Sequence, residues 1–442
     1  MPVIAAFASD QVLPKRAGVC VIGGGIAGIA TALELAERGI DVVVLEKGRI
    51  AAEQSSRNWG WCRQMGRDAR EIPLIRVAME NWQGMNARIG GETGFTRCGI
   101  VYLCDSDEDI ARHTKWLENN ARPHGLSSRM VSADEADQLM PGATRRWKGA
   151  LYTPDDARAE PFIAVPAMAE GARRKGVGIF TNCAARGLET QGGRVSAVIT
   201  ESGKIDCDTV VLAGGAWSRR FLHNLGIALP QLTVVNSVMR TAPIDTGLTR
   251  TGSGGGFTFR KRMDGGYTIT HLHYSVADIV PDSFRLFGQF LPALLLDWKG
   301  VKLRFGKRFF DEARLKRRWA LDEASPFEAV RVLDPEPVHS ILDEAAGKLI
   351  GRYPAFGPMR IAERWAGCID AMPDAVPVIS KCGALDGLHL CTGFSGHGFG
   401  LGPGAGKLMA EIVTGETPCV DPRPFRYSRF FDGSKPRPTT GL

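Results

Sequence analysis

Three glycines near the start of the chain have the spacing of a phosphate-binding turn. Gly23, Gly25 and Gly28 follow an apolar run at residues 19–22 and open a predicted helix that extends to about residue 38. In such a turn the first glycine permits the tight bend, the second lets the backbone approach a pyrophosphate, and the third lets helix and strand pack closely. The N-terminus of the helix then faces the phosphate charge.

An acidic residue stands where such a unit binds a ribose. A second apolar run at residues 42–45 ends at Glu46. A carboxylate there accepts hydrogen bonds from the ribose hydroxyls and repels a 2′-phosphate, which disfavours NADP. Strand, glycine turn, helix and strand within about thirty residues form the context that makes this motif specific for a dinucleotide. The alternative is a glycine turn with a purely structural role.

Two later apolar runs also end in glycine turns. Residues 209–213 lead into Gly214-Gly215-Ala216-Trp217-Ser218, and residues 388–392 lead into Gly393-Phe394-Ser395-Gly396-His397-Gly398. We expect the first run to add a parallel strand to the same sheet, because continuous apolar runs are typical of strands buried on both faces. A plain strand-to-helix turn is the alternative for the second run.

Together, these segments resemble the FAD-dependent amine oxidoreductases of the D-amino-acid oxidase, glycine oxidase and sarcosine oxidase superfamily. Residues 55–58, 365–367 and 373–379 are also similar to segments of that family. The resemblance implies an α/β fold, α+β overall, in which a Rossmann-like FAD-binding domain is interrupted by an antiparallel-sheet substrate domain. It places the reactive face of the flavin at the junction of the two.

The resemblance also implies domain boundaries. We expect a discontinuous FAD-binding domain made of residues 1–85, 150–222 and 345–442. Residues 86–149 and 223–344 then form the substrate-binding domain.

The resemblance implies FAD as the cofactor. Reduced flavin is an anion, and the backbone N–H groups of a glycine-rich turn at a helix start can stabilise its charged edge. Glycines are needed because the chain passes close to the ring system. We predict these cofactor-binding residues: Gly23, Gly25, Ile26, Ala27, Gly28, Glu46, Lys47, Ser55, Ser56, Arg57, Asn58, Gly60, Trp61, Ala185, Ala213, Gly214, Gly215, Trp217, Gly367, Asp374, Gly393, Phe394, Ser395, Gly396, His397 and Gly398. Cys62 is a neighbouring thiol to check for covalent flavin attachment.

Hydride transfer from a carbon next to nitrogen requires a neutral amine and an anchor for the other end of the substrate. In this superfamily the carboxylate anchor is commonly an arginine, whose planar fork pairs with two oxygens. Arg57, Arg63 and Arg67 are candidates, and Arg63 is the first choice. A solvated salt bridge is the alternative for Arg63.

A polar strand at residues 266–274 resembles the strand that presents side chains to the flavin in sarcosine oxidases. Strand alternation puts Tyr267, His271 and His273 on one face. A neutral imidazole at His271 can hold or deprotonate the amine near pH 7. We predict these three residues and Arg63 as catalytic residues. The alternative for His271 is a half-buried histidine bonded to backbone.

One position departs from the family pattern. Sarcosine oxidases carry a lysine shortly after the residue 394–399 motif, where this chain has Gly400. Either another cation replaces that lysine, or the substrate differs. Arg260, Lys261 and Arg262 are candidates for binding a second carboxylate, and a solvated cluster beside a turn is the alternative.

The predicted reaction oxidises the C–N bond of a small anionic amino or imino acid. The substrate is a D-amino acid, an N-substituted glycine or an imino-diacid such as iminodiacetate. The imine formed hydrolyses to a carbonyl product and an amine, and oxygen reoxidises the flavin to give hydrogen peroxide. One alternative is a D-amino-acid dehydrogenase that passes electrons to a quinone or a carrier protein, for which the apolar segment 284–299 with flanking basic residues argues. A second alternative is a non-catalytic FAD subunit of a larger complex.

The composition of the chain limits the ligands, the cellular compartment and the metal sites that we expect. The 442 residues allow several domain-sized cores, and a net charge of +7 without a like-charge tail favours a small anionic ligand over nucleic acid. Ten cysteines without a C-x-x-C pair are typical of buried thiols, so we expect a cytoplasmic protein without membrane association. The eight scattered histidines predict no metal site. A homodimer and a hetero-complex both remain open, and the Pro- and Arg-rich end after Pro422 predicts a loosely packed tail.

Overall fold

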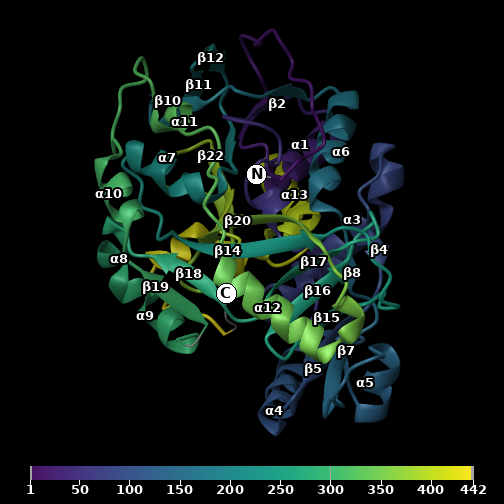
Figure 1. Ribbon diagram of the computed structural model, residues 1–442. Helices are drawn as coiled ribbons and strands as arrows, with labels where there is room; N and C mark the ends of the chain where they lie inside the picture. The colour runs from purple at the N-terminus through teal and green to yellow at the C-terminus, as the bar shows by residue number, and fades with distance from the viewer. Residues whose placement is uncertain (1, 299, 440–442) are drawn as a thin grey trace.

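The computed structural model describes residues 2–298 and 300–439, which fold around two large sheets (Figure 1). The first sheet has the strand order β21-β22-β13-β1-β2-β9, with parallel pairing everywhere except at its β21 edge. Its strands are β1 (Val19–Ile22), β2 (Val42–Leu45), β9 (Gly178–Phe180), β13 (Val210–Leu212), β21 (Val378–Lys381) and β22 (Leu388–Thr392).

Both faces of this first sheet are buried, which explains the continuous apolar runs. Val19 and Val21 of β1 pack into a core with α1 (Ile26–Glu37), α3 (Ile72–Ile89), α6 (Pro161–Arg174) and α13 (Gly398–Thr414). Cys20 and Ile22 pack on the other face with the antiparallel strands β10 (Ala185–Gln191), β11 (Arg194–Thr200) and β12 (Gly203–Asp206) and with α7 (Ser218–Asn224).

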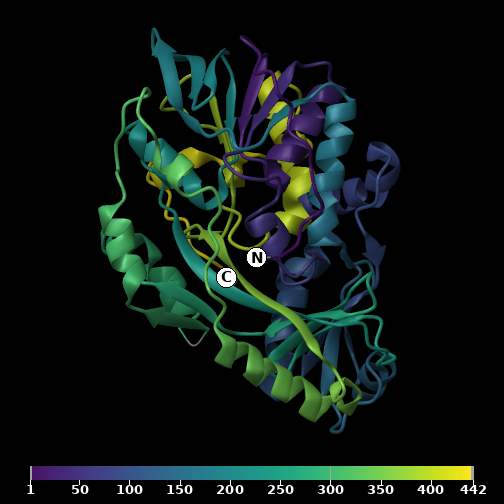
Figure 2. The same cartoon turned by 45° about the horizontal axis from the view of Figure 1, so that its top comes forward.

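The second sheet has the order β19-β18-β14-β17-β16-β15-β5-β7-β6, and β20 pairs with β14. In Figure 2 the first sheet and its helices lie at the top, and this larger sheet lies below with α12 (His339–Arg352) against it. Its strands are β5 (Ile100–Cys104), β6 (Arg129–Val131), β7 (Gly149–Thr153), β14 (Leu232–Thr241), β15 (Thr251–Gly254), β16 (Phe257–Lys261), β17 (Tyr267–His271), β18 (Ser275–Asp278), β19 (Val301–Arg304) and β20 (Ile361–Ala371).

Strand pairing crosses two of the boundaries expected from the sequence. β7 pairs with β5, and β20 pairs with β14 along its length, so residues 149–153 and 361–371 belong to the large sheet. The boundaries at 150 and 345 had assigned most of these residues to the FAD-binding part. Which sheet a strand joins depends on long-range pairing, and the local sequence pattern does not contain it.

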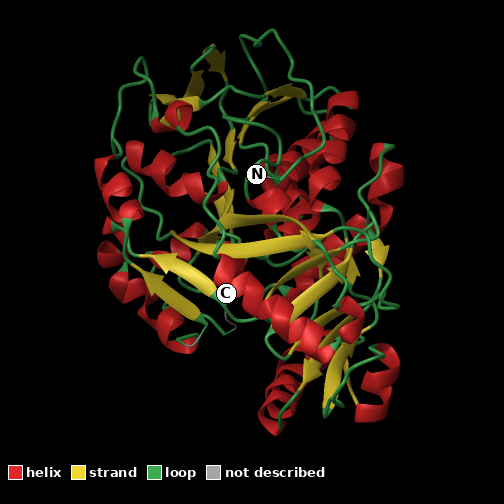
Figure 3. Cartoon of the chain, in the orientation of Figure 1, coloured by secondary structure: helices red, strands yellow, loops and turns green. Residues whose placement is uncertain are grey.

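The remaining elements are short and lie around the two sheets (Figure 3). A small sheet joins β3 (Trp61–Cys62), β8 (Ala157–Arg158) and β4 (Thr96–Arg97). The other helices are α2 (Gln54–Arg57), α4 (Asp107–Trp116), α5 (Ala133–Leu139), α8 (Pro281–Arg285), α9 (Phe287–Leu296), α10 (Lys307–Arg314) and α11 (Pro326–Ala329). Within the described ranges, no helix combines the length and apolar character needed to cross a membrane.

Glycines on α13 set how closely this helix approaches its neighbours. A Cβ at Gly402 would lie 2.6 Å from the Ile26 side chain, and one at Gly406 would lie 2.5 Å from the Ala30 backbone. α13 therefore packs directly on α1. The helix begins at Gly398, directly after the glycine turn, and its own glycines serve packing rather than chain reversal.

Residues 423–430 pack against the rest of the protein, which corrects the expectation of a loose tail for this part of the segment after Pro422, whereas residues 431–435 are exposed. Phe425, Tyr427 and Arg429 are buried. Nε and Nη2 of Arg429 lie 3.0 and 3.1 Å from the carboxylate oxygens of Asp374, which is fully buried. A composition argument misses this pair because its partners are far apart in sequence.

Arg429→Ala leaves the Asp374 carboxylate buried with one cation fewer. We expect the variant to lose about 3 kcal/mol of stability, the usual cost of breaking a buried ion pair. Scanning calorimetry of the FAD-loaded protein measures this loss as a lower thermal midpoint. Arg423→Ala, which removes an exposed pair with Asp421, is the control and should change the midpoint little. Equal midpoints for the two variants contradict a stabilising role of the tail.

Candidate functional site

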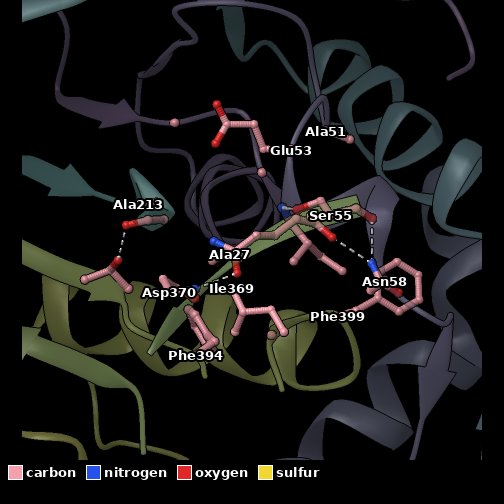
Figure 4. A pocket seen from close by; sticks show the side chains of 18 of the residues that line it. Ala27, Ala51, Glu53, Ser55, Asn58, Ala213, Ile369, Asp370, Phe394 and Phe399 are labelled. Carbon is pink, nitrogen blue, oxygen red and sulfur yellow. Dashed lines mark hydrogen bonds between the residues drawn. The ribbon is translucent and has the colours of Figure 1, made fainter. Parts of the chain in front are cut away.

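A cavity of about 270 Å³ lies between the two sheets, at the carboxyl ends of the parallel strands. Figure 4 shows Ala51 and Glu53, which follow β2, on one side of it, and Ile369, Asp370 and Phe394 on the other. The large sheet contributes Asn236 and Val238 from β14 to the same lining. Clefts at this edge of an open α/β sheet are the usual ligand sites of the fold.

The glycine turn at the head of α1 has no room for side chains. Gly23 has φ +119°, and a Cβ there would lie 2.3 Å from the carbonyl oxygen of Ala213. A Cβ on Gly28 would lie 2.0 Å from the Gly23 carbonyl. At Gly25 an added Cβ meets only Ser55 Oγ, at 3.2 Å, so this backbone is open to the cavity. The turn therefore offers the close approach that a pyrophosphate requires.

Glu46 is held at the edge of the cavity by backbone groups. Its Oε2 accepts from the Gly24 N–H and its Oε1 accepts from the Gly48 N–H, both at 2.7 Å. Burial raises the pKa of this carboxyl, whereas Lys47 and the two N–H groups favour its ionised form. Its remaining lone pairs can accept from ribose hydroxyls.

The turn after β22 places backbone and an unpartnered carboxylate oxygen at the cavity. The Gly393 N–H donates to Oδ2 of Asp370 at 2.8 Å. Oδ1 of Asp370 is buried and has no partner among the described residues, and burial raises the pKa of this carboxyl to about 6. His397 lies at the start of α13, with Nδ1 2.9 Å from Oε2 of the buried Glu71. A polar cofactor edge fits this lining.

The three candidate arginines have different surroundings. Arg57 is already bound, with Nη1 2.6 Å from Asp334 and 2.9 Å from the Ala366 carbonyl. Arg63 lines the cavity with its guanidinium 5.6 Å from the Trp61 ring centre. Arg67 also lines it and is buried, and its Nη1 has no hydrogen-bond partner within the described chain. Burial and the charge of Arg63 lower the pKa of Arg67 to about 10.

Most of the predicted cofactor residues lie on this one cavity. Those that line it are Gly23, Gly25, Ile26, Ala27, Glu46, Lys47, Ser55, Arg57, Asn58, Trp61, Ala185, Ala213, Gly214, Gly215, Trp217, Gly367, Phe394, Ser395, Gly396, His397 and Gly398, and Arg63 lines it as well. Gly28, Ser56, Gly60 and Gly393 do not line it, although Gly28 packs against Gly23 and the Gly393 N–H donates to Asp370, which both do. Asp374 lies elsewhere, paired with Arg429 and with Arg70 at 3.2 Å.

The histidine-bearing strand β17, predicted to carry catalytic side chains, does not present them to the cavity. Tyr267, His271 and His273 do not line the cavity. The hydroxyl of Tyr267 donates to the Leu248 carbonyl at 2.6 Å, and His271 stacks on Tyr274 with Nε2 3.5 Å from Glu344 of α12. Both faces of β17 are buried, so the alternation of polar and apolar residues in the sequence does not predict which face packs against α12. Burial and Lys348 lower the pKa of His271 to about 4, which suits a neutral structural histidine.

Two further candidates, Arg260 for binding a second carboxylate and Cys62 for covalent flavin attachment, are buried away from the cavity lining. Arg260 is buried with Nη1 2.8 Å from Glu160, and its Nε donates to the Trp59 carbonyl at 2.6 Å. It is therefore neither a solvated residue nor a second carboxylate anchor. Cys62 is fully buried and outside the lining, and burial raises the pKa of its thiol.

Sequence reasoning missed several residues of the lining. They are Arg49, Glu53, Gln54, Trp59, Asn236, Val238, Ser275, Phe327, Ile369, Asp370, Thr392 and Phe399. Asp370 lies between two segments quoted for the resemblance, so that proximity was an available signal. Asn236 and Ser275 come from strands of the large sheet, and only the pairing of β14 with β18 and β20 brings them here.

Comparison with known proteins agrees with this geometry. The family model described as FAD dependent oxidoreductase matches residues 18–412. The chain belongs to this family of FAD-dependent oxidoreductases. FAD is therefore its cofactor, and the chain is an FAD-dependent amino acid or amine oxidoreductase.

Among known proteins, the chain is 34% identical to an L-amino acid deaminase from Proteus myxofaciens solved in complex with anthranilate, with a TM-score of 0.93 and 96% coverage of both chains. It is 35% identical to the L-amino acid deaminase from Proteus vulgaris, with a TM-score of 0.92, covering 96% of this chain and 100% of that one. It is also 26% identical to a glycine oxidase from Pseudomonas aeruginosa, over 92% of this chain and 97% of the relative.

Gly25→Val places a branched side chain where the backbone opens to the cavity, next to Ser55 Oγ alone. We expect the variant to keep its fold by circular dichroism and to retain about tenfold less FAD after dialysis, because the pyrophosphate approach is blocked. Visible absorbance measures the bound flavin. Gly84→Ala on α3, where a Cβ meets no atom within 4 Å, is the matched control. Full FAD content in Gly25→Val contradicts the assignment of this turn.

Proposed function

We propose that this protein oxidises the α-carbon–nitrogen bond of a primary α-amino acid. Bound FAD accepts the two electrons, and the resulting imine hydrolyses to a 2-oxo acid and ammonia. Similarity to two L-amino acid deaminases favours an L-α-amino acid over the D-amino acids, N-substituted glycines and imino-diacids expected from the sequence. The observation that carries the proposal is Nη1 of Arg67, which lines the cavity and has no hydrogen-bond partner among the described residues, whereas Nε of the same group donates to the Arg63 carbonyl at 3.2 Å.

The position of Arg67 explains the absence of a lysine at position 400. A Cβ on Gly400 would lie 3.1 Å from the Trp61 carbonyl and 3.5 Å from Nη2 of Arg67. A side chain at position 400 would therefore enter the space that the Arg67 guanidinium occupies. We infer that Arg67 supplies the carboxylate-binding cation, with Arg63 as its neighbour. A guanidinium can pair with both carboxylate oxygens at once.

Aromatic residues complete the proposed substrate end of the cavity. Trp59 and Trp61 line the cavity with their ring centres 5.2 Å apart, edge to face. Phe399, the second residue of α13, also lines it. Such walls favour an apolar substrate side chain, since burying apolar surface is the main driving force for binding. Anthranilate, bound by the Proteus myxofaciens protein, is likewise an aromatic carboxylate with an amine.

The same surroundings favour the reactive form of the amine. Positive charge from Arg63 and Arg67 and the apolar walls both disfavour an ammonium ion beside them. The substrate therefore binds with a lowered amine pKa and loses its proton without a strong dedicated base. This account replaces the role proposed for His271.

Oxygen is the proposed acceptor for the reduced cofactor, giving hydrogen peroxide. The second candidate is transfer to a quinone or a carrier protein, and one surface feature favours it. Large apolar side chains are exposed on α8, α9, β19 and α10, for example Phe284 at 68% and Leu295 at 67%. An exposed apolar surface of this kind is typical of contact with a partner or a lipid surface. A non-catalytic FAD subunit is the third candidate, and the unpartnered Nη1 of Arg67 on the cavity wall argues against it.

Anaerobic titration tests the reaction. We expect the visible flavin band of the purified protein to bleach with apolar L-α-amino acids such as L-phenylalanine and L-leucine, and to persist with their D-forms, sarcosine and iminodiacetate. Admitting air then separates an oxidase, whose band returns quickly with peroxide, from a dehydrogenase that needs an added quinone. A band that no amino acid bleaches, although dithionite does, contradicts the proposed function.

Arg67→Gln removes the proposed carboxylate anchor while keeping a polar side chain. We expect KM for the amino acid to rise about 10- to 100-fold, the usual worth of a hydrogen bond to a charged group. Arg67→Lys keeps the charge and should recover part of this loss. The control is Arg97→Gln, an exposed arginine 3.8 Å from Asp155, which should leave KM unchanged. An unchanged KM in Arg67→Gln with FAD fully bound contradicts the assignment.

A further inference from the structure

A second cavity, of about 160 Å³, lies beside the flavin cavity. α7 forms one side of it, and α8 and α10 form the other (Figure 1). Besides its charged residues, its lining includes Trp217, His223, Gln231 and Thr233. None of the chemistry proposed above uses this space.

The lining carries more positive than negative charge. Five arginines face two carboxylates, Asp282 and Glu312. Arg219 and Arg285 each lie 2.7 Å from Asp282, and Arg220 lies 2.6 Å from Glu312. Burial opposes the ionisation of Asp282, but these two arginines lower its pKa to about 2, so it stays charged.

Two further arginines of the lining pair with neither Asp282 nor Glu312. Arg308 reaches outside the lining to Asp278 at 3.3 Å and donates to Thr233 Oγ1 at 2.6 Å. Arg317, on the exposed rim, forms no ion pair with any described carboxylate. Burial, and after it the charges of Arg219 and Arg317, lower the pKa of His223. The cavity therefore has a cationic excess that an anion can neutralise.

The wall between the two cavities is one residue thick in places. Trp217 lines both of them. Gln231 accepts from the Arg219 N–H at 3.1 Å and donates to the Gly215 carbonyl at 3.1 Å, and Gly215 lines the flavin cavity. Arg219, which lines the second cavity, is thus linked through Gln231 to the turn that lines the flavin cavity.

We propose that this second cavity binds a phosphate group and that its occupation slows the release of FAD. A tetrahedral dianion accepts hydrogen bonds from several directions, which matches a lining whose arginines come from α7, α8, α10 and the segment after α10. The bound group bridges α7, which follows the Gly215–Trp217 turn, to α8 and α10. This bridge keeps the cofactor wall in place. The proposal does not depend on the amino acid substrate.

Isothermal titration of the FAD-loaded protein with inorganic phosphate tests the site, with chloride at equal ionic strength as the blank. We expect saturable binding at one site, weakened about tenfold or more in Arg317→Gln because a charged hydrogen bond is lost. Arg318→Gln, the exposed neighbour outside the lining, is the matched control and should bind like the unaltered protein. Flavin fluorescence after dilution should show FAD release slowed about threefold or more by phosphate.

The phosphate group can be free or part of a lipid. Sedimentation with phosphatidylglycerol vesicles, compared with phosphatidylcholine vesicles, separates the two sources. Retention on the anionic vesicles that Arg317→Gln abolishes and Arg318→Gln preserves assigns the site to a lipid headgroup. The proposal is overturned if neither probe binds in an Arg317-dependent way, or if saturating phosphate leaves FAD release unchanged.

Discussion

The close approach of the Gly23 turn to the end of β13 is the constraint on which the site depends. A Cβ at Gly23 would collide with the Ala213 carbonyl at 2.3 Å, and one at Gly28 would collide with the Gly23 carbonyl at 2.0 Å. Because neither position carries a side chain, α1 starts at the edge of the first sheet beside Glu46 and the Gly214–Gly215 turn. The pairing of β14 with β20 then brings the large sheet over this edge and closes the cavity.

Charge determines what the closed cavity can hold. Burying a polar atom without a partner is costly, and we therefore propose that Nη1 of Arg67, which lacks a partner among the described residues, binds an anionic ligand. Arg57 carries the same charge, and its Nη2 also lacks a partner among the described residues. Its Nη1, unlike that of Arg67, is bound to Asp334 and the Ala366 carbonyl, which holds Arg57 against β20. The second cavity, on the other side of Trp217, is also lined by arginines, and they outnumber its carboxylates.

The sequence predicted the parts of this structure that depend on local spacing. The strand, glycine turn, helix and strand that end at Glu46 lie as expected, and the turns after β13 and β22 reach the same cavity. Long-range pairing limited the rest. The face of β17 that carries His271 is covered by α12, and Asp374 pairs with Arg429 from the end of the chain. The sequence alone did not explain why position 400 is a glycine, because Arg67, which lies next to it in the structure, is far from it in the sequence.

A crystal structure of the FAD-loaded protein with anthranilate bound tests the central claim most directly. The account predicts that the anthranilate carboxylate accepts a hydrogen bond from Nη1 of Arg67, with its ring against Trp59 or Trp61. A carboxylate bound by other groups, with Nη1 of Arg67 still lacking a partner, would contradict the account.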